Sequence, residues 1–248
     1  MYSIGIDIGG MSIKIGLVDE QGRIVKSNRR KTEKTADLCI KNMVDQINEL
    51  FSEYNLTVKD IKGIGVGCPG AVSREKGIVE FLPNLGWYNV DFVKELKKYF
   101  DTRIEISNDA NVATLAEALY GVAKDYNSCI MFTLGTGVGG GIVLDKKLYE
   151  GGHSKGTELG HTTLIFGGKK CTCGRNGCIE QYVSATALIE QTKKEMIKNK
   201  ASNMWNFVEG DINKVDGRTA FECAKKGDKS AIIVRDNYVK YLSESILN

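Results

Sequence analysis

Two patterns of apolar residues recur along the chain, and each predicts one kind of element. Short apolar runs bounded by glycine or polar turns predict strands at residues 4–8, 12–18, 23–26, 61–67, 103–107, 129–134 and 140–144. Apolar residues at helical spacing predict helices over residues 37–54, 91–100, 111–120, 184–199, 218–226 and 230–247. Residues 151–177 follow neither pattern and form an irregular stretch rich in glycine, cysteine and lysine.

The opening pattern returns in the middle of the chain. A shift of 126 positions places Gly9 on Gly135 and Asp19 on Asp145, so that strand, glycine turn, strand and second turn all correspond. Chance clustering of glycines is the alternative explanation. A repeat of this length favours two related domains, which we expect at residues 1–116 and 117–248.

The composition is that of an ordinary globular protein, with 42% hydrophobic and 26% charged residues. The net charge of +3 is too small to argue for a nucleic-acid or membrane partner. Met1 leads directly into the first predicted strand without a basic or apolar leader, so we expect a cytoplasmic protein. Seven cysteines in such a chain argue against a disulfide framework, and Cys39, Cys68, Cys129 and Cys223 are expected to be buried small residues.

The first glycine turn carries the residue types that bind phosphate. Around it lie Asp7, Gly9, Gly10, Ser12 and Lys14. Glycines let backbone N–H groups approach phosphate oxygens closely, and a carboxylate such as that of Asp7 can hold Mg²⁺ through water. A hairpin without any ligand is the alternative for this turn taken alone.

A second glycine turn contains Gly135, Thr136 and Gly137, and with Gly140 it also matches the dinucleotide-binding fingerprint G-x-G-x-x-G. That fingerprint requires a helix after the glycines, whereas residues 142–145 predict a strand and a turn. We therefore reject dinucleotide binding. Two related turns in one chain favour phosphate binding between facing domains.

Asp109 lies between a predicted strand and a predicted helix, where a helix cap is the simplest role for it. Phosphoryl transfer to a sugar, however, needs a carboxylate that accepts the hydroxyl proton, together with polar groups that fix the ring hydroxyls. The polar candidates for the second task are Asn84, Asn108, Glu158, His161 and Glu180.

One histidine and three clustered cysteines form the pattern H-x9-C-x-C-x4-C. They are His161, Cys171, Cys173 and Cys178. Three thiolates and one imidazole suit a tetrahedral zinc ion, and four protein ligands leave no open position, so we expect a structural metal. Unrelated thiols or a redox pair are the alternatives.

In these segments the chain resembles the ROK family (repressor, open reading frame, kinase) of bacterial sugar kinases and regulators. The resemblance runs from residue 4 to about residue 184. It rests on the motifs at residues 7–10, 108–111, 134–141, 158–161 and 171–180, of which the last is the most specific.

The resemblance implies an α/β, actin-like ATPase (ribonuclease H-like) fold of two domains, with ATP and sugar bound between them. The first domain would hold the first phosphate loop and a catalytic base at Asp109, and the second would hold the other phosphate loop and the zinc loop. The sugar would contact Asp109 and the five polar candidates. His161 would then serve both zinc and sugar, one ring nitrogen for each.

Two departures from the family pattern stand out. Met11 occupies a position where the family usually has Thr, so Ser12 must supply any hydroxyl contact to phosphate. Family kinases also continue past the end of this chain, with an adenosine-binding turn and a helix that returns to the first domain. We therefore expect this chain to bind sugar better than ATP. We also expect uncovered apolar residues on its last helix, which self-association into a homodimer would mask. They are Val234, Tyr238, Tyr241, Leu242 and Ile246.

The function expected from the sequence is ATP-dependent phosphorylation of the 6-hydroxyl of a hexose, glucose before others. N-acetylmannosamine, allose and fructose stay open as substrates. A sugar-responsive repressor of the same family would carry a helix-turn-helix module ahead of the kinase-like part, for which the first strand leaves no room here. An inactive kinase fragment is the third alternative.

Overall fold

The computed structural model describes residues 1–82, 84–152 and 157–247, which fold into two compact units. Unit 1 comprises Met1–Met131 and Gly141–Thr157, and unit 2 comprises Phe132–Gly140 and Glu158–Asn248. The chain therefore passes from one unit to the other three times. The boundaries of these units differ from those of the predicted domains, 1–116 and 117–248. That the two domains correspond to the domains of an actin-like fold stays a prediction.

Unit 1 is built on a five-stranded sheet with the strand order β3-β2-β1-β4-β8. Its strands are β1 (Tyr2–Ile8), β2 (Ser12–Val18), β3 (Ile24–Lys31), β4 (Ile61–Cys68) and β8 (Ile104–Asn108). The first three strands are antiparallel neighbours, whereas β4 runs parallel to both β1 and β8. The sequence predicted all five, although β3 continues five residues beyond the predicted run.

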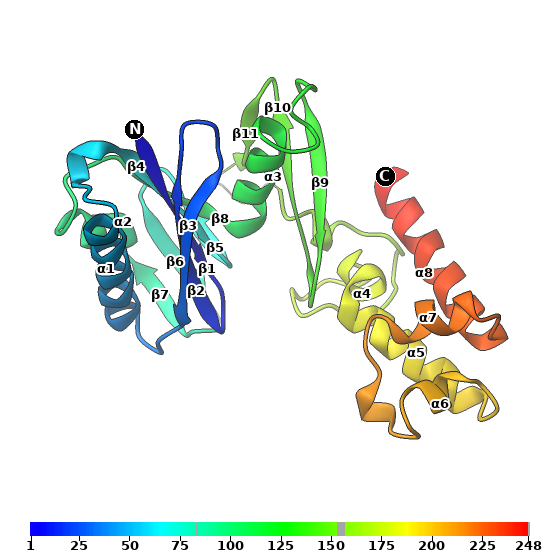
Figure 1. Cartoon of the computed structure of the whole chain (residues 1–248). Coiled ribbons are helices and arrows are strands. Elements are labelled where there is room, and N and C mark those ends of the chain that lie inside the picture. Colours follow the sequence, from blue (N-terminus) through cyan, green and yellow to red (C-terminus); the bar gives the residue numbers. More distant parts are fainter. Residues whose placement is uncertain (83, 153–156, 248) are drawn as a thin grey trace. The chain divides into compact units, whose positions relative to one another are not determined.

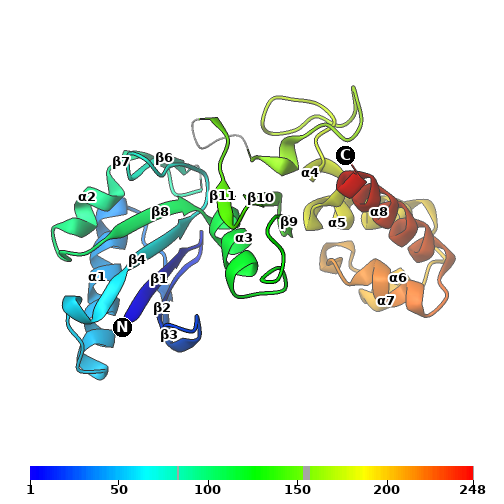
Figure 2. The ribbon, with the colours of Figure 1, turned by 90° about the horizontal axis from the view of Figure 1, so that it is seen from above.

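One face of this sheet is apolar and covered by helices. Alternate residues such as Ile4, Ile6 and Ile8 are almost fully buried on that face. Helices α1 (Ala36–Glu53) and α2 (Phe92–Lys97) pack there, and Figure 2 shows both on the same side of the sheet. Helix α1 begins after Thr35, whose hydroxyl accepts a hydrogen bond from the Leu38 N–H, as helix caps commonly do.

The opposite face is rich in glycine. Gly5, Gly65 and Gly67 occupy it, and a side chain at Gly5 or Gly65 would project into open space. Helix α3 (Asp109–Leu119) lies on this side (Figure 2), and its Val112 approaches Gly67 so closely that a Cβ there would lie 2.8 Å from the valine methyl group. Glycine at this position lets α3 start beside the ends of β4 and β8.

Two small sheets complete the strands. One contains β5 (Ala71–Ser73), β6 (Ile78–Leu82) and β7 (Trp87–Val90), and the other contains β9 (Cys129–Leu134), β10 (Val138–Leu144) and β11 (Lys147–Tyr149). Asp145 and Lys146 join β10 to β11 with positive φ angles of 47° and 61°, which fits a type I′ hairpin turn. The sequence predicted this turn and the strands β9 and β10, but none of β5, β6, β7 and β11.

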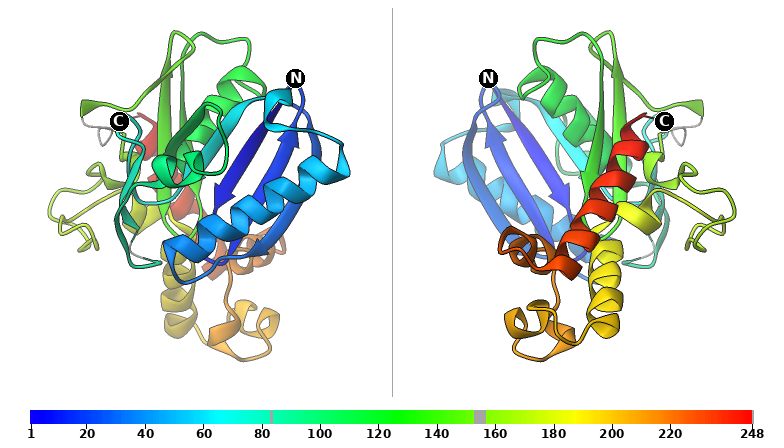
Figure 3. Two further views of the ribbon diagram at one scale, coloured as in Figure 1. Left: turned by 90° about the vertical axis from the view of Figure 1, so that its left-hand side faces the viewer. Right: turned by 90° about the vertical axis from the view of Figure 1, so that its right-hand side faces the viewer.

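Unit 2 is largely helical beyond its strand residues (Figures 1 and 3). Its α-helices are α4 (Glu180–Val183), α5 (Ala185–Lys198), α6 (Met204–Phe207), α7 (Thr219–Lys225) and α8 (Lys229–Leu247). Their apolar faces share one core, which includes Leu188, Met196, Met204 and Ala231. Among the described residues, no helix has the length and apolar character needed to cross a bilayer.

The structure corrects two expectations about apolar side chains. Val234 and Tyr238 of α8 were expected to be uncovered, but they are only 3% and 9% exposed, since α8 packs into the core of unit 2. The Tyr238 hydroxyl also donates a hydrogen bond of 2.8 Å to the Val183 carbonyl. Cys129 is half-buried, whereas Cys39, Cys68 and Cys223 are buried as expected.

Candidate functional site

The turn between β1 and β2 is a tight glycine hairpin. The Gly9 N–H donates to the Ser12 carbonyl at 3.0 Å, and a Cβ at Gly9 would lie 2.9 Å from the same oxygen. Thr32, directly after β3, stabilises the turn through a 2.6 Å hydrogen bond from its hydroxyl to the Gly9 carbonyl. Gly10 has open space around it. The predicted phosphate turn is thus a closely fixed backbone with an accessible tip.

Asp7 and Lys14 face each other across the β1–β2 pair, and their side chains form an ion pair of 2.9 Å. Both side chains are more than half exposed, so this pair contributes little to stability and can be remodelled by a ligand. Both residues, together with Asp109, line one pocket of about 650 Å³. The glycine-rich sheet face and residues Val112, Ala113 and Ala116 of α3 form its apolar walls.

Asn108 and Asp109 divide two roles at the start of α3. Asn108 is the helix cap, because its side-chain oxygen accepts hydrogen bonds from the Ala110 and Asn111 N–H groups at 3.0 and 3.3 Å. Its amide nitrogen donates to the Gly70 carbonyl at 3.3 Å. Asp109 is therefore not needed as the cap, and its carboxylate, which accepts the Ala110 N–H at 2.8 Å and the backbone N–H of Asp109 itself, is available for chemistry.

The pKa of the Asp109 carboxyl is raised above its ordinary value. The main cause is burial, which disfavours the charged form, and the nearby Asp7 carboxylate adds like-charge repulsion; the Ala110 N–H opposes both. The surrounding protein removes part of the hydration of the carboxylate. Asp109 as a whole residue is nevertheless exposed, because one side of it stays open to the pocket. A carboxylate with a raised pKa is a better proton acceptor than a free one.

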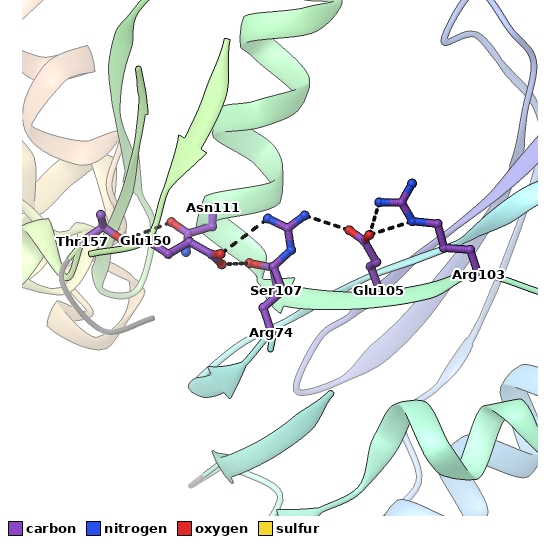
Figure 4. Close-up of polar contacts among 7 residues, drawn as sticks. All are labelled: Arg74, Arg103, Glu105, Ser107, Asn111, Glu150 and Thr157. Atoms are coloured by element: carbon purple, nitrogen blue, oxygen red, sulfur yellow. Dashed lines mark hydrogen bonds and ion pairs between the residues drawn. The ribbon is translucent and has the colours of Figure 1, made fainter. Parts of the chain in front are cut away.

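A polar network within unit 1 connects β8, which ends at Asn108, to Glu150 of the segment after β11 (Figure 4). The Ser107 hydroxyl donates to Glu150 at 2.7 Å, and Arg74 lies 3.5 Å from the same carboxylate and 2.8 Å from Glu105. Arg103 pairs with the other side of Glu105. Nothing in the sequence indicates this network, because its members are far apart along the chain and match no motif.

Asn111 makes the second connection in Figure 4. It accepts a 3.3 Å hydrogen bond from the Thr157 hydroxyl, and both residues are buried. A Cβ at Gly141 would lie 3.3 Å from the Asn111 side-chain oxygen and 2.3 Å from the Thr114 hydroxyl. Helix α3 therefore fixes both ends of the segment that unit 1 receives from the second half of the chain.

In unit 2, the second glycine turn is held by a carboxylate. Glu180, at the start of α4, accepts the Val138 N–H at 3.0 Å, and a Cβ at Gly137 would lie 2.4 Å from the same carboxylate. The Gly135 carbonyl accepts the Ala185 N–H at 2.8 Å. The predicted phosphate turn and the predicted sugar residue Glu180 are thus brought into direct contact, while Thr136 stays exposed.

Glu158 directly precedes a short turn, η3 (Leu159–His161), in the same unit, and His161 is the last residue of that turn. The backbone of this turn lies against β10, and a Cβ at Gly160 would lie 1.9 Å from the Val138 carbonyl oxygen. Glu158 is exposed and His161 is half-buried. Asn84, the other predicted sugar residue, is an exposed turn residue of unit 1 and does not line the pocket of Asp109.

The four predicted zinc ligands of unit 2 meet in space. The donor atoms of His161, Cys171, Cys173 and Cys178 all lie within 4.8 Å of one another. Two glycines with positive φ angles, Gly174 and Gly177, turn the chain between the cysteines. A Cβ at Gly177 would lie 1.7 Å from the Ile165 carbonyl oxygen, so only glycine fits there.

These distances fit a tetrahedral zinc ion. With Zn–S near 2.3 Å and Zn–N near 2.0–2.1 Å, tetrahedral geometry separates two sulfurs by about 3.8 Å and a sulfur from a nitrogen by about 3.5 Å. The Cys173 and Cys178 sulfurs are 3.6 Å apart, and the Cys171 sulfur is 3.6 Å from His161 Nδ1. The set of soft donors and its spacing therefore suit zinc, and Nδ1 is the nitrogen that would bind it.

Comparisons with known proteins agree on the relationship. The model of the ROK family matches residues 3–248. The glucokinase of Thermotoga maritima is 35% identical over 247 residues, which make up 98% of this chain and 76% of that protein. The xylose repressor of Bacillus subtilis is 33% identical over 199 residues, or 79% of this chain and 52% of the repressor.

A solved structure extends the likeness to the fold. The ROK family glucokinase from Streptomyces griseus, in complex with glucose and AMPPNP, gives a TM-score of 0.78 at 29% identity and covers 99% of this chain and 78% of its own. This likeness confirms the predicted actin-like α/β fold. The family match over nearly the whole chain shows that the chain belongs to the ROK family.

Proposed function

We propose that the protein is an ATP-dependent sugar kinase that phosphorylates the 6-hydroxyl of a hexose, with glucose as the first candidate. The observation that carries this proposal is in unit 1, where Asp109 shares a pocket with Asp7 and Lys14. A proton acceptor and a carboxylate–ammonium pair beside a glycine turn are the groups that phosphoryl transfer to a hydroxyl requires. The glucokinases among the relatives support both the reaction and the sugar.

In the proposed reaction, the Asp109 carboxylate accepts the proton of the sugar hydroxyl as the hydroxyl oxygen attacks the γ-phosphorus of ATP. The bond from that phosphorus to the β,γ-bridging oxygen breaks, and ADP leaves. Lys14 neutralises charge on the phosphate oxygens and the Gly10 N–H binds them, while Gly9, whose own N–H is donated to the Ser12 carbonyl, keeps the turn tight. The exposed Asp7 carboxylate would hold Mg²⁺, which offsets phosphate charge when bound. Because the Asp109 pKa is raised, the carboxylate takes up the proton more readily than a free aspartate would.

The other predicted contacts belong to the same proposal. Nucleotide binding would also involve Ser12 and the second glycine turn, which contains Gly135, Thr136 and Gly137. The sugar would contact five further polar side chains. These are Asn84, Asn108, Glu158, His161 and Glu180. We propose a structural role for zinc, because its four ligands leave no position for substrate.

The decisive test compares Asp109→Asn with Asp101→Asn in a coupled ADP-release assay with glucose. Asp101 is an exposed aspartate seven residues before Asn108, so its substitution makes the same chemical change away from the pocket. We expect Asp109→Asn to lower kcat by about 10²–10⁴-fold with an unchanged circular dichroism spectrum, and Asp101→Asn to keep full activity. Activity of Asp109→Asn within a few-fold of the wild type would exclude Asp109 as the base.

A sugar-binding regulator is the second candidate, favoured by the similarity to the xylose repressor. Calorimetry with glucose and the ADP-release assay separate the two functions, because a regulator binds sugar without producing ADP. A panel with N-acetylmannosamine, allose and fructose then tests which sugar is preferred.

A further inference from the structure

Unit 2 contains a small pocket that the proposed kinase reaction does not use. It has a volume of about 210 Å³ and lies where α5 and α8, which pack side by side (Figure 3), meet Lys169 of the zinc loop. Helix α5 supplies a charged stripe of side chains, and α8 supplies a mostly apolar one. The lining residues of α5 and α8 are Gln191, Lys194, Glu195, Lys198, Ile233, Val234, Asn237 and Tyr241.

Positive charge predominates in this pocket. Three of its residues are lysines, at positions 169, 194 and 198, and Glu195 is its one carboxylate. Glu195 is already paired, since its oxygen lies 3.5 Å from the Lys198 ammonium group. The Glu190 carboxylate, outside the lining, favours the charged form of Lys169, whereas Lys194 disfavours it. Among the described residues, Lys194 therefore remains as the ammonium group without a carboxylate partner, inside a space that holds only a small molecule. Holding like charges together costs free energy unless an opposite charge joins them.

The hydrogen-bonding groups of the pocket are mostly donors. Lys169 gives one N–H to the Gln181 carbonyl at 3.0 Å and lies over the Tyr182 ring, which leaves its other ammonium hydrogens for a ligand. Within the part of the chain that the structure describes, the Lys194 ammonium has no hydrogen bond or ion pair. The half-buried Tyr241 adds a hydroxyl, and its ring packs against that of Tyr182 with 5.1 Å between the ring centroids.

We propose that this pocket binds a compact phosphate-bearing anion, as inorganic phosphate or as a phosphate monoester. Such an anion carries about two negative charges at neutral pH and accepts several hydrogen bonds, which suits a pocket lined by three ammonium groups, of which that of Lys194 has no partner among the described residues. The apolar wall formed by Ile233 and Val234 suits the carbon part of a monoester better than a free ion. None of the lining residues belongs to the proposed catalytic set.

The test is calorimetric titration of the full chain with inorganic phosphate and, in a second arm, with glucose 6-phosphate, at constant ionic strength. We expect the wild type to bind phosphate and Lys194→Gln to bind it about fivefold more weakly or worse. Lys193→Gln is the matched control, because it removes the same charge from the neighbouring position of α5 without touching the lining. It should bind within about twofold of the wild type. If the wild type binds glucose 6-phosphate more tightly than phosphate, and Lys194→Gln abolishes this difference, a phosphate monoester is the preferred ligand. If the wild type binds both with equal affinity, the ligand is phosphate.

Three results would overturn the proposal. They are no phosphate binding by the wild type at millimolar concentration, equal binding by Lys194→Gln, and equal losses in both variants, which would indicate a general effect of charge. Lys194 is exposed, so its substitution should leave the fold intact, and thermal unfolding without ligand checks this. Because kinase activity is not the measurement, failure of this test would leave the proposed function untouched.

Discussion

Replacing Cys178 by serine should destabilise unit 2 through its metal and leave unit 1 unchanged. The Cys178 side chain is fully buried and its sulfur lies 3.6 Å from that of Cys173, so a serine there would fill the space but bind zinc poorly. Cys223 is the matched control, since it is 2% exposed in the same unit and takes no part in the cluster.

The magnitude follows from the geometry of four nearly equivalent ligands. Structural zinc contributes about 10–16 kcal/mol of apparent binding free energy at neutral pH, so one ligand of four accounts for about 2.5–4 kcal/mol. For a unit of roughly 100 residues, 1 kcal/mol changes Tm by about 4–8 °C. The expected loss for Cys178→Ser is therefore on the order of 10–30 °C when zinc is present.

Tryptophan fluorescence can follow each unit separately, because the two tryptophans of the chain are divided between them. Trp87 lies in β7 of unit 1, and Trp205 lies in α6 of unit 2. A Trp87→Phe background reports on unit 2 alone. Each variant is unfolded once with zinc and once with a chelator. The loss of Tm caused by chelation is then compared between the variant and the wild type, so that the packing cost of the serine, which is present in both conditions, cancels.

With chelator, the wild type and Cys178→Ser should unfold at nearly the same temperature. Cys223→Ser should lose similar stability under both conditions. An unchanged Trp205 transition when the wild type is chelated would refute the reasoning, as would elemental analysis that finds no zinc in fresh protein.

Two further predictions concern the pH dependence of activity and the zinc loop. The Asp109 pKa is raised in the folded protein and only the ionised carboxylate accepts a proton, so kcat/KM should fall as the pH drops through a value above that of a free aspartate. Asp7→Asn removes the neighbouring like charge, so the fall of kcat/KM at acidic pH should move to lower pH in this variant. An unchanged pH–rate profile would show that Asp7 does not raise the pKa of Asp109. Gly177→Ala should lower Tm far more than Gly174→Ala: both glycines have positive φ, which costs any other residue about 1–2 kcal/mol, but only at Gly177 would the new Cβ collide with a carbonyl oxygen. Equal Tm losses in thermal unfolding would show that backbone conformation alone decides.

The sequence predicted elements best where one face is buried along a whole element. Residues 37–54 have an unbroken apolar stripe, and α1 begins and ends within one residue of that prediction. The small sheet of β5, β6 and β7 was missed, because its strands are short and expose large residues such as Phe81 and Tyr88, which obscures the alternation. Each of these strands contributes only one or two buried residues to the core, which is too few to establish an alternating pattern.

The candidate site was predictable in its local parts only. The zinc ligands lie close together in sequence with a spacing characteristic of the metal, and the structure brings them together. The division of roles between Asn108 and Asp109 was not predictable, since either side chain can cap a helix and only the hydrogen bonds distinguish them. The burial of Val234 and Tyr238 was missed because it depends on α4, α5 and α7, which the spacing within α8 does not reveal.

The three passages of the chain between its units have a consequence for synthesis and for proteolysis. Unit 1 takes its last segment, Gly141–Thr157, only after part of unit 2 has been made. As the chain leaves the ribosome, the sheet of β1–β4 and β8 can form early, but Ser107 and Asn111 wait for Glu150 and Thr157 before their hydrogen bonds close. No single proteolytic cut separates the two units: a cut after Met131 leaves residues 141–157 of unit 1 with unit 2, and a cut after Thr157 leaves residues 132–140 of unit 2 with unit 1. Limited digestion should therefore yield fragments that stay associated until denaturant is added.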